Sequence, residues 1–253
     1  MGDLRIRDLS QSFPREDGTE LTVLDHLNID VQDKEFVCIL GASGCGKTTM
    51  LRLIAGLDTA RSGTILLDGE EMKGPNSKVG FVFQEYSLFP WRSVIDNIAF
   101  GLEMKGIGKE ERYRIADRYL ELVNLTAFKT NYPSELSGGM RQRVAVARAL
   151  ALDPVLLLMD EPFGALDAQT RNMLQTELLV IWEKTKKTII FITHSVDEAV
   201  FMSDRIIVLT PRPGGLCHIV PIDLPRPRDR TSTEFAQVRR EVLDLINQKC
   251  SIQ

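Results

Sequence analysis

The sequence predicts an α/β protein with a mainly parallel sheet, an antiparallel β part at the N-terminus and a helical insert. Three short apolar runs at 36–40, 155–159 and 188–193 have the length and composition of strands buried on both faces. Apolar residues alternate in patches between positions 4 and 31, which favours antiparallel strands. From about 85 to 151 the pattern turns helical, and strand–helix alternation then continues to about 209.

The individual elements follow from the same patterns. We expect strands at 64–67, 79–83 and 216–224, and helices at 95–104, 110–123 and 140–151. Ser195 and Glu198 have the spacing of a capping box, so a helix starts there. Thr231 and Glu234 repeat that spacing after an extended basic linker at 224–230. The apolar face of this last helix consists of Phe235, Val238, Val242, Leu245 and Ile246.

The composition places the chain among ordinary globular proteins. Its 253 residues include 43% hydrophobic and 26% charged residues, enough for one large domain with a subdomain. The net charge of −4 gives no basic excess, so we expect no nucleic-acid partner. No segment has the length to span a bilayer, and residues 1–5 do not begin a signal peptide. The cysteines at 38, 45, 217 and 250 lack metal-binding spacing, and we expect reduced thiols in the cytosol.

Residues 41–48 read GASGCGKT and have the pattern of a phosphate-binding loop between a strand and a helix. Its glycines let successive N–H groups turn towards phosphate oxygens, and the helix N-terminus adds partial positive charge. Lys47 reaches the β- and γ-phosphates, and the Thr48 hydroxyl is a ligand for Mg²⁺. The predicted nucleotide contacts of this loop are Gly41, Ala42, Ser43, Gly44, Cys45, Gly46, Lys47, Thr48 and Thr49.

Two carboxylates end the strand at 155–159, at the edge where α/β sheets place their ligands. Asp160 suits Mg²⁺, and Glu161 is placed to orient or deprotonate an attacking water. His194 ends the strand at 188–193 and is expected at the same edge, where an imidazole can hydrogen-bond the γ-phosphate. An ordinary strand with solvated polar residues at its end is the alternative for each residue taken alone.

A second glycine-containing helix start, LSGGMRQR, lies at 136–143. Ser137 is a good N-cap, and Gly138 and Gly139 leave backbone N–H groups accessible to an anion. Two copies arranged head to tail would bury two nucleoside triphosphates between them. Arg141 and Arg143 are open to a purely structural role.

The chain resembles the ATPase subunit of an ABC transporter from about residue 4 to about residue 230. The resemblance lies in the order of its motifs, which are the phosphate loop, Gln84, LSGGMRQR, LLLMDEP at 156–162, residues 164–167 and His194. The resemblance implies a P-loop NTPase core at 1–230 with a helical subdomain at about 85–151, and a C-terminal helix and tail at 231–253. It implies that Gln84 contacts Mg²⁺ and reports nucleotide state to a membrane partner. It further implies that Ser137, Gly138 and Gly139 close over the γ-phosphate of the opposite subunit, and that Asp167 crosses the interface. Phe13 stands where the family places an aromatic ring against adenine.

Two segments resemble the corresponding sequences in the ATPases of nitrate, sulfonate, taurine and bicarbonate importers. They are LFPWRSVIDNIAFGL at 88–102 and LPRPRDR at 224–230. That resemblance implies ATP and Mg²⁺, a homodimer at the cytoplasmic face of the plasma membrane, a separate permease and, indirectly, a solute-binding protein. Phe89, Pro90 and Trp91 are either core residues or an apolar lip that accepts a permease helix.

Other classes of protein fit the sequence less well. A soluble ABC-type ATPase with a non-transport partner is the main alternative. A small-molecule kinase or GTPase would lack LSGGMRQR, and a non-catalytic clamp would have no need of Glu161 and His194.

Cys45 lies beside Lys47 and a helix N-terminus. Both favour the thiolate, so we expect a reactive thiol where solvent reaches it, and we expect bound ATP to protect it from alkylation.

Overall fold

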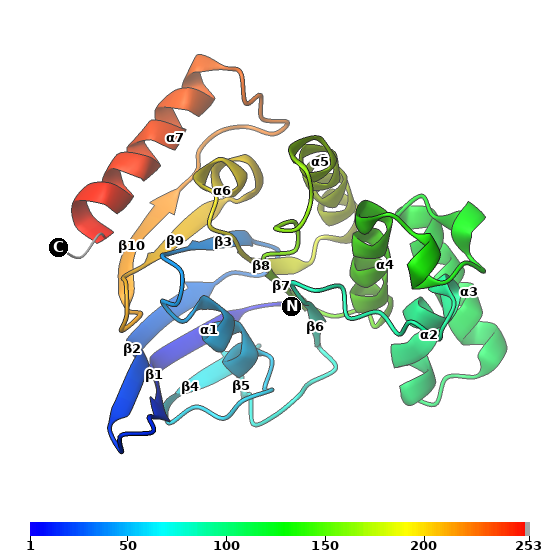
Figure 1. Ribbon diagram of the computed structural model, residues 1–253, viewed down its shortest axis with the longest axis horizontal. Coiled ribbons are helices and arrows are strands. Elements are labelled where there is room, and N and C mark those ends of the chain that lie inside the picture. The colour runs from blue at the N-terminus through cyan, green and yellow to red at the C-terminus, as the bar shows by residue number, and fades with distance from the viewer. Residues whose placement is uncertain (251–253) are drawn as a thin grey trace. The chain divides into compact units, whose positions relative to one another are not determined.

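The computed structural model describes residues 1–250 and divides into two compact units (Figure 1). Unit 1 combines Met1–Asn76 with the segment that starts at Thr188, and unit 2 is Ser77–Lys187. The helical pattern expected at 85–151 lies within unit 2, and the C-terminal helix belongs to unit 1. The expected boundary at residue 230 stays a prediction.

An antiparallel sheet in the order β2-β1-β4-β5 opens unit 1. Its buried side chains alternate along β1, with Leu4 and Ile6 inside, as the period of two in the sequence predicts. The strands are β1 (Leu4–Pro14), β2 (Glu20–Val31), β4 (Ser62–Leu67) and β5 (Glu70–Glu71).

The predicted parallel sheet contributes four neighbouring strands to unit 1, in the order β10-β9-β3-β8. β3 pairs in parallel with β8 and β9, and β10 is antiparallel to β9. Every residue of β3 and β8 is buried, which explains why both runs are continuously apolar. The strands are β3 (Phe36–Leu40), β8 (Thr188–Ile192), β9 (Arg205–Leu209) and β10 (Leu216–Pro221).

The α-helices in the described part of unit 1 are α1 (Lys47–Ile54), α6 (Val196–Met202) and α7 (Thr233–Leu245), and a short π-helix (Ile246–Cys250) follows α7. The cap predicted for α6 is confirmed, because the Ser195 hydroxyl accepts a hydrogen bond from the Glu198 N–H at 3.3 Å. The cap predicted for α7 is wrong by one residue. Ser232 accepts from the Phe235 N–H at 3.1 Å, whereas the Thr231 hydroxyl donates to Asp229 at 2.7 Å.

The arginines of the basic segment 224–230 anchor it to the rest of unit 1. Arg228 is buried, and its guanidinium donates to the carbonyls of Val200 and Ser203, both at 2.6 Å. Burial lowers the pKa of Arg228 to about 10, so the side chain is still a cation at neutral pH. Arg226 pairs with Asp204 in the same region. The arginines therefore close the C-terminal end of α6, where helix carbonyls lack partners.

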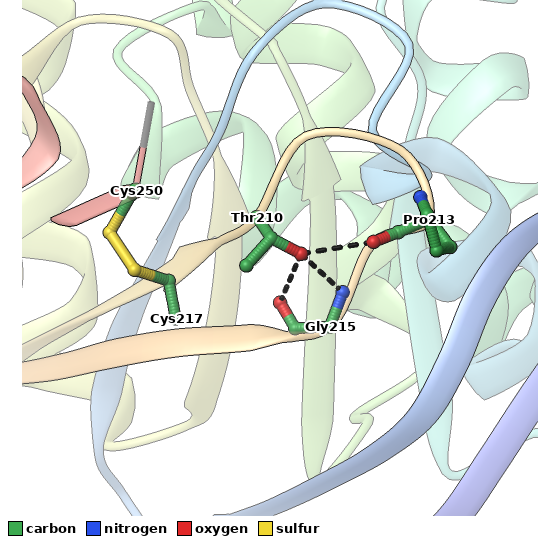
Figure 2. The surroundings of a disulfide bond; sticks show 5 residues. All are labelled: Thr210, Pro213, Gly215, Cys217 and Cys250. Carbon is green, nitrogen blue, oxygen red and sulfur yellow. Dashed lines mark hydrogen bonds between the residues drawn. A yellow bond between two sulfur atoms is a disulfide. The ribbon is translucent and has the colours of Figure 1, made fainter. Parts of the chain in front are cut away.

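A disulfide links Cys217 on β10 to Cys250 after α7, with 5.8 Å between the Cα atoms (Figure 2). The expectation of four reduced thiols is therefore wrong for this pair. Sequence spacing could not reveal it, because 33 residues separate the two cysteines and only the return of α7 towards β10 brings them together. Cys38 and Cys45 are free thiols and both are buried.

We expect the disulfide to stabilise unit 1 by about 3 to 4 kcal/mol, because it closes a long loop in the unfolded chain. Cys217→Ser should therefore lower the thermal midpoint by several degrees. The measurement is a thermal melt of wild type and variant, each with and without a phosphine reductant. Reductant should bring wild type down to the variant and leave the variant unchanged. A wild-type midpoint that does not respond to full reduction would contradict the prediction.

Unit 2 joins a pair of strands to a cluster of helices. β6 (Val79–Val82) pairs in parallel with β7 (Leu156–Asp160). α2 (Val94–Met104), α3 (Lys109–Leu122) and α4 (Gly138–Ala151) pack on one another, and α5 (Ala168–Thr185) contacts α4 (Figure 1). Within residues 1–250, no helix combines the length and apolar character needed to cross a bilayer.

Candidate functional site

The segment between β3 and α1 forms a tight loop. Gly44 and Gly46 adopt left-handed backbone angles, with φ of 76° and 100°. A side chain on Gly46 would meet Leu24 at 2.8 Å, so glycine is needed there for space as well as for conformation. α1 begins at Lys47, directly after the loop, with its first N–H groups at the loop's edge. This is the backbone shape that the sequence pattern predicts for a phosphate cradle.

Lys47 is only 7% exposed, and its ammonium donates to the carbonyls of Gly41 at 2.9 Å and Ala42 at 3.0 Å. The side chain therefore curls over the loop that precedes it. An anion in the loop would meet a cation that is already held in place by two backbone acceptors. Thr48 is exposed on the first turn of α1.

His194 leaves the parallel sheet at the same edge as the phosphate loop. β3 and β8 are adjacent parallel strands, and the Thr193 N–H donates to the Ile39 carbonyl at 3.2 Å. Thr193 is also hydrogen-bonded to the buried carboxylate of Glu198, which fixes the backbone just before the histidine. The His194 side chain is exposed. Within unit 1, the structure thus brings His194 and the loop to one edge, as the sequence predicts.

Unit 2 gathers the second set of predicted residues at the ends of β6 and β7. The two strands pair in parallel, and the last paired residues are Val82 and Met159. Gln84 and Asp160 follow these residues within two positions, so they lie at the same end of the strand pair. Asp160 is buried, while Gln84 is exposed. Glu161 has φ of +41°, a left-handed conformation that is uncommon for a residue with a side chain. Such strain is typical of functional positions.

The LSGG segment begins α4 as predicted, and the Ser137 hydroxyl accepts from the Met140 N–H at 3.3 Å. The structure starts the helix at Gly138, two residues before the predicted start. A side chain on Gly138 would meet Leu166 at 3.1 Å, and one on Gly139 would meet Thr170 at 3.0 Å. The glycines thus allow close packing against the start of α5.

Asp167 caps α5 by accepting a hydrogen bond from the Thr170 N–H at 3.0 Å. Hydrogen bonds from the backbone and side chain of Thr170 lower the pKa of Asp167, so the cap is a carboxylate at neutral pH. The segments that hold Ser137 and Asp167 are therefore neighbours within unit 2.

Phe13 lies near the end of β1, opposite Leu21 of β2, and is 40% exposed. An exposed ring of this kind is available for stacking. Its contact with adenine stays a prediction.

Cys45 is buried, with 1% of its surface exposed, so the condition on which the expectation of a reactive thiol rests, access of solvent to the sulfur, is not met. Burial raises the pKa of the Cys45 thiol, although the charges of Lys47 and Arg212 act in the opposite direction. The sequence shows the nearby charges but not the loop that encloses the sulfur.

We therefore expect Cys45 to react with a maleimide at least tenfold more slowly than an exposed cysteine at pH 7.5, since a thiol with a raised pKa is almost wholly protonated there. The rate should increase as the pH rises towards the raised pKa. Mass spectrometry of digested protein after timed labelling measures this, with urea-unfolded protein as the control. Rapid labelling of the folded protein would show that the loop is open in solution.

A cavity of about 550 Å³ lies in unit 2 and is lined by α3, α4 and α5. Gln142 lines it, and its side-chain amide is buried without a hydrogen-bond partner in the protein. Arg143 pairs with Glu177 at 2.7 Å beside it, which gives Arg143 the structural role left open by the sequence. None of the predicted site residues lines this cavity. Among the described residues, no cluster of His, Cys, Asp or Glu has the makings of a metal site.

Sequence reasoning missed one segment that contacts the phosphate loop. Arg212 donates to the carbonyl of Gly44 at 2.7 and 3.0 Å. The signal was available, because the sequence Pro-Arg-Pro-Gly-Gly at 211–215 follows a buried strand.

Comparison with known proteins explains this arrangement. A family profile described as ABC transporter matches residues 24–164. The chain belongs to the ABC transporter family. As an ABC ATPase it is 56% identical over 96% of its length to the uncharacterized ABC transporter ATP-binding protein MJ0412 of Methanocaldococcus jannaschii, and covers 91% of that protein.

Two further relatives of this ABC ATPase carry more specific names. The aliphatic sulfonates import ATP-binding protein SsuB of Bacillus cereus is 46% identical, with 94% of this chain and 93% of that protein covered. The nitrate import ATP-binding protein NrtD of Synechocystis sp. is 48% identical, with 94% of this chain and 89% of that protein covered.

A solved structure shares the fold of this ABC ATPase. It is a dimeric post-hydrolysis state of the ATP-binding cassette MJ0796 bound to ADP and Pi, with a TM-score of 0.76 at 30% identity. The alignment covers 88% of this chain and 100% of that chain. The predicted α/β fold and the predicted ATPase class are confirmed.

Proposed function

We propose that this chain is the ATP-hydrolysing subunit of an ABC importer for a small anionic solute, of the class that contains nitrate, sulfonates, taurine and bicarbonate. The observation that carries the proposal is the identity of 46% and 48%, over nearly the whole chain, to sulfonate and nitrate import ATP-binding proteins. In this proposal the subunit works peripherally at the cytoplasmic face of a membrane, as a role shared with these import ATP-binding relatives implies.

The residues present fit MgATP. The loop 41–48 offers backbone N–H groups and a held ammonium, which suit the phosphates of ATP. Thr48, Gln84 and Asp160 supply a hydroxyl, an amide and a carboxylate, which are the hard oxygen donors that Mg²⁺ prefers. A Mg²⁺ ion held by these residues would supply positive charge against the phosphates of ATP. Glu161 serves as the base that orients and deprotonates water, and His194 hydrogen-bonds the γ-phosphate or that water.

A second copy of the chain completes the site. Ser137, Gly138 and Gly139 present a capped helix start to the γ-phosphate bound by the opposite subunit, and Asp167 lies across the interface. Support comes from the contact between these two segments within unit 2 and from the dimeric state of the related cassette. A two-fold dimer of this kind holds two ATP molecules.

The segment after Gln84, which contains Phe89 and Trp91, contacts the permease in this proposal. Trp91 is 72% exposed and lies beside Phe89, with ring centroids 5.7 Å apart. The turn that carries it is rigid, because the buried Asn97 amide accepts from the Phe89 N–H at 2.8 Å and donates to the carbonyls of Arg92 and Ser93 at 3.0 Å. A large exposed aromatic residue on a rigid turn favours a docking lip over a core position.

We expect Trp91→Ala to leave the ATPase activity of the isolated subunit nearly intact, because Asn97 and not Trp91 holds the turn. Docking to the permease should weaken by about 2 kcal/mol or more, the usual cost of an anchoring aromatic residue. Co-purification with the permease and solute uptake in vesicles measure this. Tyr132→Ala, which removes another exposed aromatic residue of unit 2, is the matched control. An isolated variant that misfolds, or uptake that is unchanged, would contradict the docking role.

The importer proposal itself is tested by co-expression with candidate permease and solute-binding proteins from the same genome. Reconstituted complex should hydrolyse ATP faster when the binding protein carries nitrate, a sulfonate, taurine or bicarbonate. Failure to assemble with any permease, together with full activity alone, would favour a soluble ABC-type ATPase with a non-transport partner.

A further inference from the structure

The turn between β9 and β10, residues 210–215, is internally cross-linked. The Thr210 hydroxyl donates to the Pro213 carbonyl at 3.0 Å and accepts from the Gly215 N–H at 2.8 Å (Figure 2). The Thr210 N–H also donates to the Gly215 carbonyl at 2.9 Å. One hydroxyl thus ties the two ends of the turn together, and the residues between them have little freedom to move separately.

The same turn is fastened to β2. The Gly214 N–H donates to the Val23 carbonyl at 2.8 Å, and the Asp25 N–H donates to the Gly214 carbonyl at 3.2 Å. Through β2 the turn is joined to the antiparallel sheet, and through β9 to the parallel sheet. It is therefore a fixed point on the surface of unit 1.

From this fixed point the turn contacts two consecutive carbonyls of the phosphate loop. The Arg212 guanidinium donates to the Gly44 carbonyl from Nη2 at 2.7 Å and from Nε at 3.0 Å. The backbone of Gly214 lies so near Cys45 that a Cβ on Gly214 would be 2.0 Å from the Cys45 carbonyl oxygen. Only glycine permits this approach.

We propose that the β9–β10 turn holds the phosphate loop in the shape that receives nucleotide phosphates, and that Arg212 is a positioning residue for nucleotide binding. The carbonyl of Gly44 and the N–H of Cys45 belong to one planar peptide and point in opposite directions. Because Arg212 holds that carbonyl outward, the Cys45 N–H faces the inside of the loop, where it donates to the Ala42 carbonyl at 3.3 Å. A phosphate oxygen can take the place of that acceptor. The inference rests on the proposed nucleotide site.

Positioning through the loop differs in a measurable way from direct contact between Arg212 and the γ-phosphate. The loop amides cradle the inner phosphates, which ADP and ATP share. A loop that is held less firmly should therefore bind both nucleotides more weakly, by the same factor. Loss of a direct γ-phosphate contact would lower the affinity for ATP alone.

The first test measures the dissociation constants of ATP and ADP by calorimetry for wild type, Arg212→Met and Arg212→Lys. We expect Arg212→Met to lower the affinity for both nucleotides about tenfold, which corresponds to the loss of a charge-assisted pair of hydrogen bonds. The turnover rate at saturating ATP should change little, so that KM rises while kcat does not. Arg212→Lys should recover part of the affinity, because an ammonium can donate to the same carbonyl. Arg240→Met, which removes an exposed arginine from α7, is the control.

The second test is independent of Arg212. Gly214→Ala forces a Cβ against the Cys45 carbonyl, whereas a Cβ on the neighbouring Gly215 meets nothing nearer than 3.6 Å. Gly214→Ala should weaken ATP and ADP equally, and Gly215→Ala should bind both as wild type does. Circular dichroism shows that the variants are folded.

Unchanged affinity for both nucleotides in Arg212→Met and Gly214→Ala overturns the proposal. A loss confined to ATP overturns it in favour of direct phosphate contact. If wild type binds neither ATP nor ADP, the proposed nucleotide site is itself refuted, and the role of the turn with it.

Discussion

Lys47→Ala is expected to abolish measurable ATP hydrolysis, with a fall in kcat of at least about a hundredfold. The ammonium is held at the start of α1 by the carbonyls of Gly41 and Ala42. Replacing a fixed cation at a site of developing negative charge typically costs several kcal/mol of transition-state stabilisation. ATP affinity should fall as well, because the loop keeps its backbone donors but loses its buried charge.

Phosphate release measured at saturating MgATP tests this expectation. Lys34→Ala, at an exposed lysine of unit 1, is the matched control, because it makes the same change in charge and side chain. Circular dichroism separates loss of chemistry from loss of fold. Hydrolysis at a near-normal rate would remove Lys47 from the site and with it the assignment of the loop.

Glu161→Gln is expected to trap a dimer with bound ATP. The amide keeps the size of the side chain but cannot accept a proton from water, so the chemical step should slow by about 10² to 10⁴-fold. Because ATP lies between two copies in the proposed dimer, the interface should stay closed while ATP is not hydrolysed. The left-handed φ at position 161 strains the backbone equally for Gln and for Glu.

Size-exclusion chromatography in MgATP should show a dimer for Glu161→Gln, and mostly monomer for wild type without nucleotide. Glu183→Gln changes an exposed carboxylate of α5 and should behave as wild type does. The added substitution Ser137→Arg should break the trapped dimer, because it fills the helix start that meets the opposite nucleotide. A Glu161→Gln protein that stays monomeric and hydrolyses ATP normally would refute the role of Glu161 as the base.

The local elements were largely predictable because their signals are short in range. The strand at 36–40 and the cap at Ser195 occur where the sequence places them, since burial on both faces and a capping hydroxyl are properties of a few adjacent residues. The same reasoning failed at Thr231. Its hydroxyl donates a hydrogen bond to Asp229, and a competing partner two residues away cannot be weighed from capping-box spacing alone.

The basic segment 224–230 shows a different limit. Its prolines and arginines predict an extended basic linker, and the structure adds that Arg228 is buried among carbonyls that end α6. Free carbonyls at a helix end attract a buried cation, but the sequence does not show which helix end lies beside the segment.

The sequence by itself determined the fold class, the family resemblance and the residue types of the predicted nucleotide site, because phosphate and Mg²⁺ chemistry demands particular groups at close spacing along the chain. Only the tertiary structure decided the state of the cysteines: Cys217 and Cys250 are joined across 33 residues, and Cys45 is enclosed. It also decided that Arg212 reaches the Gly44 carbonyl from 168 residues away. Burial and long-range contact depend on which segments pack together, and no local pattern of residues encodes that information.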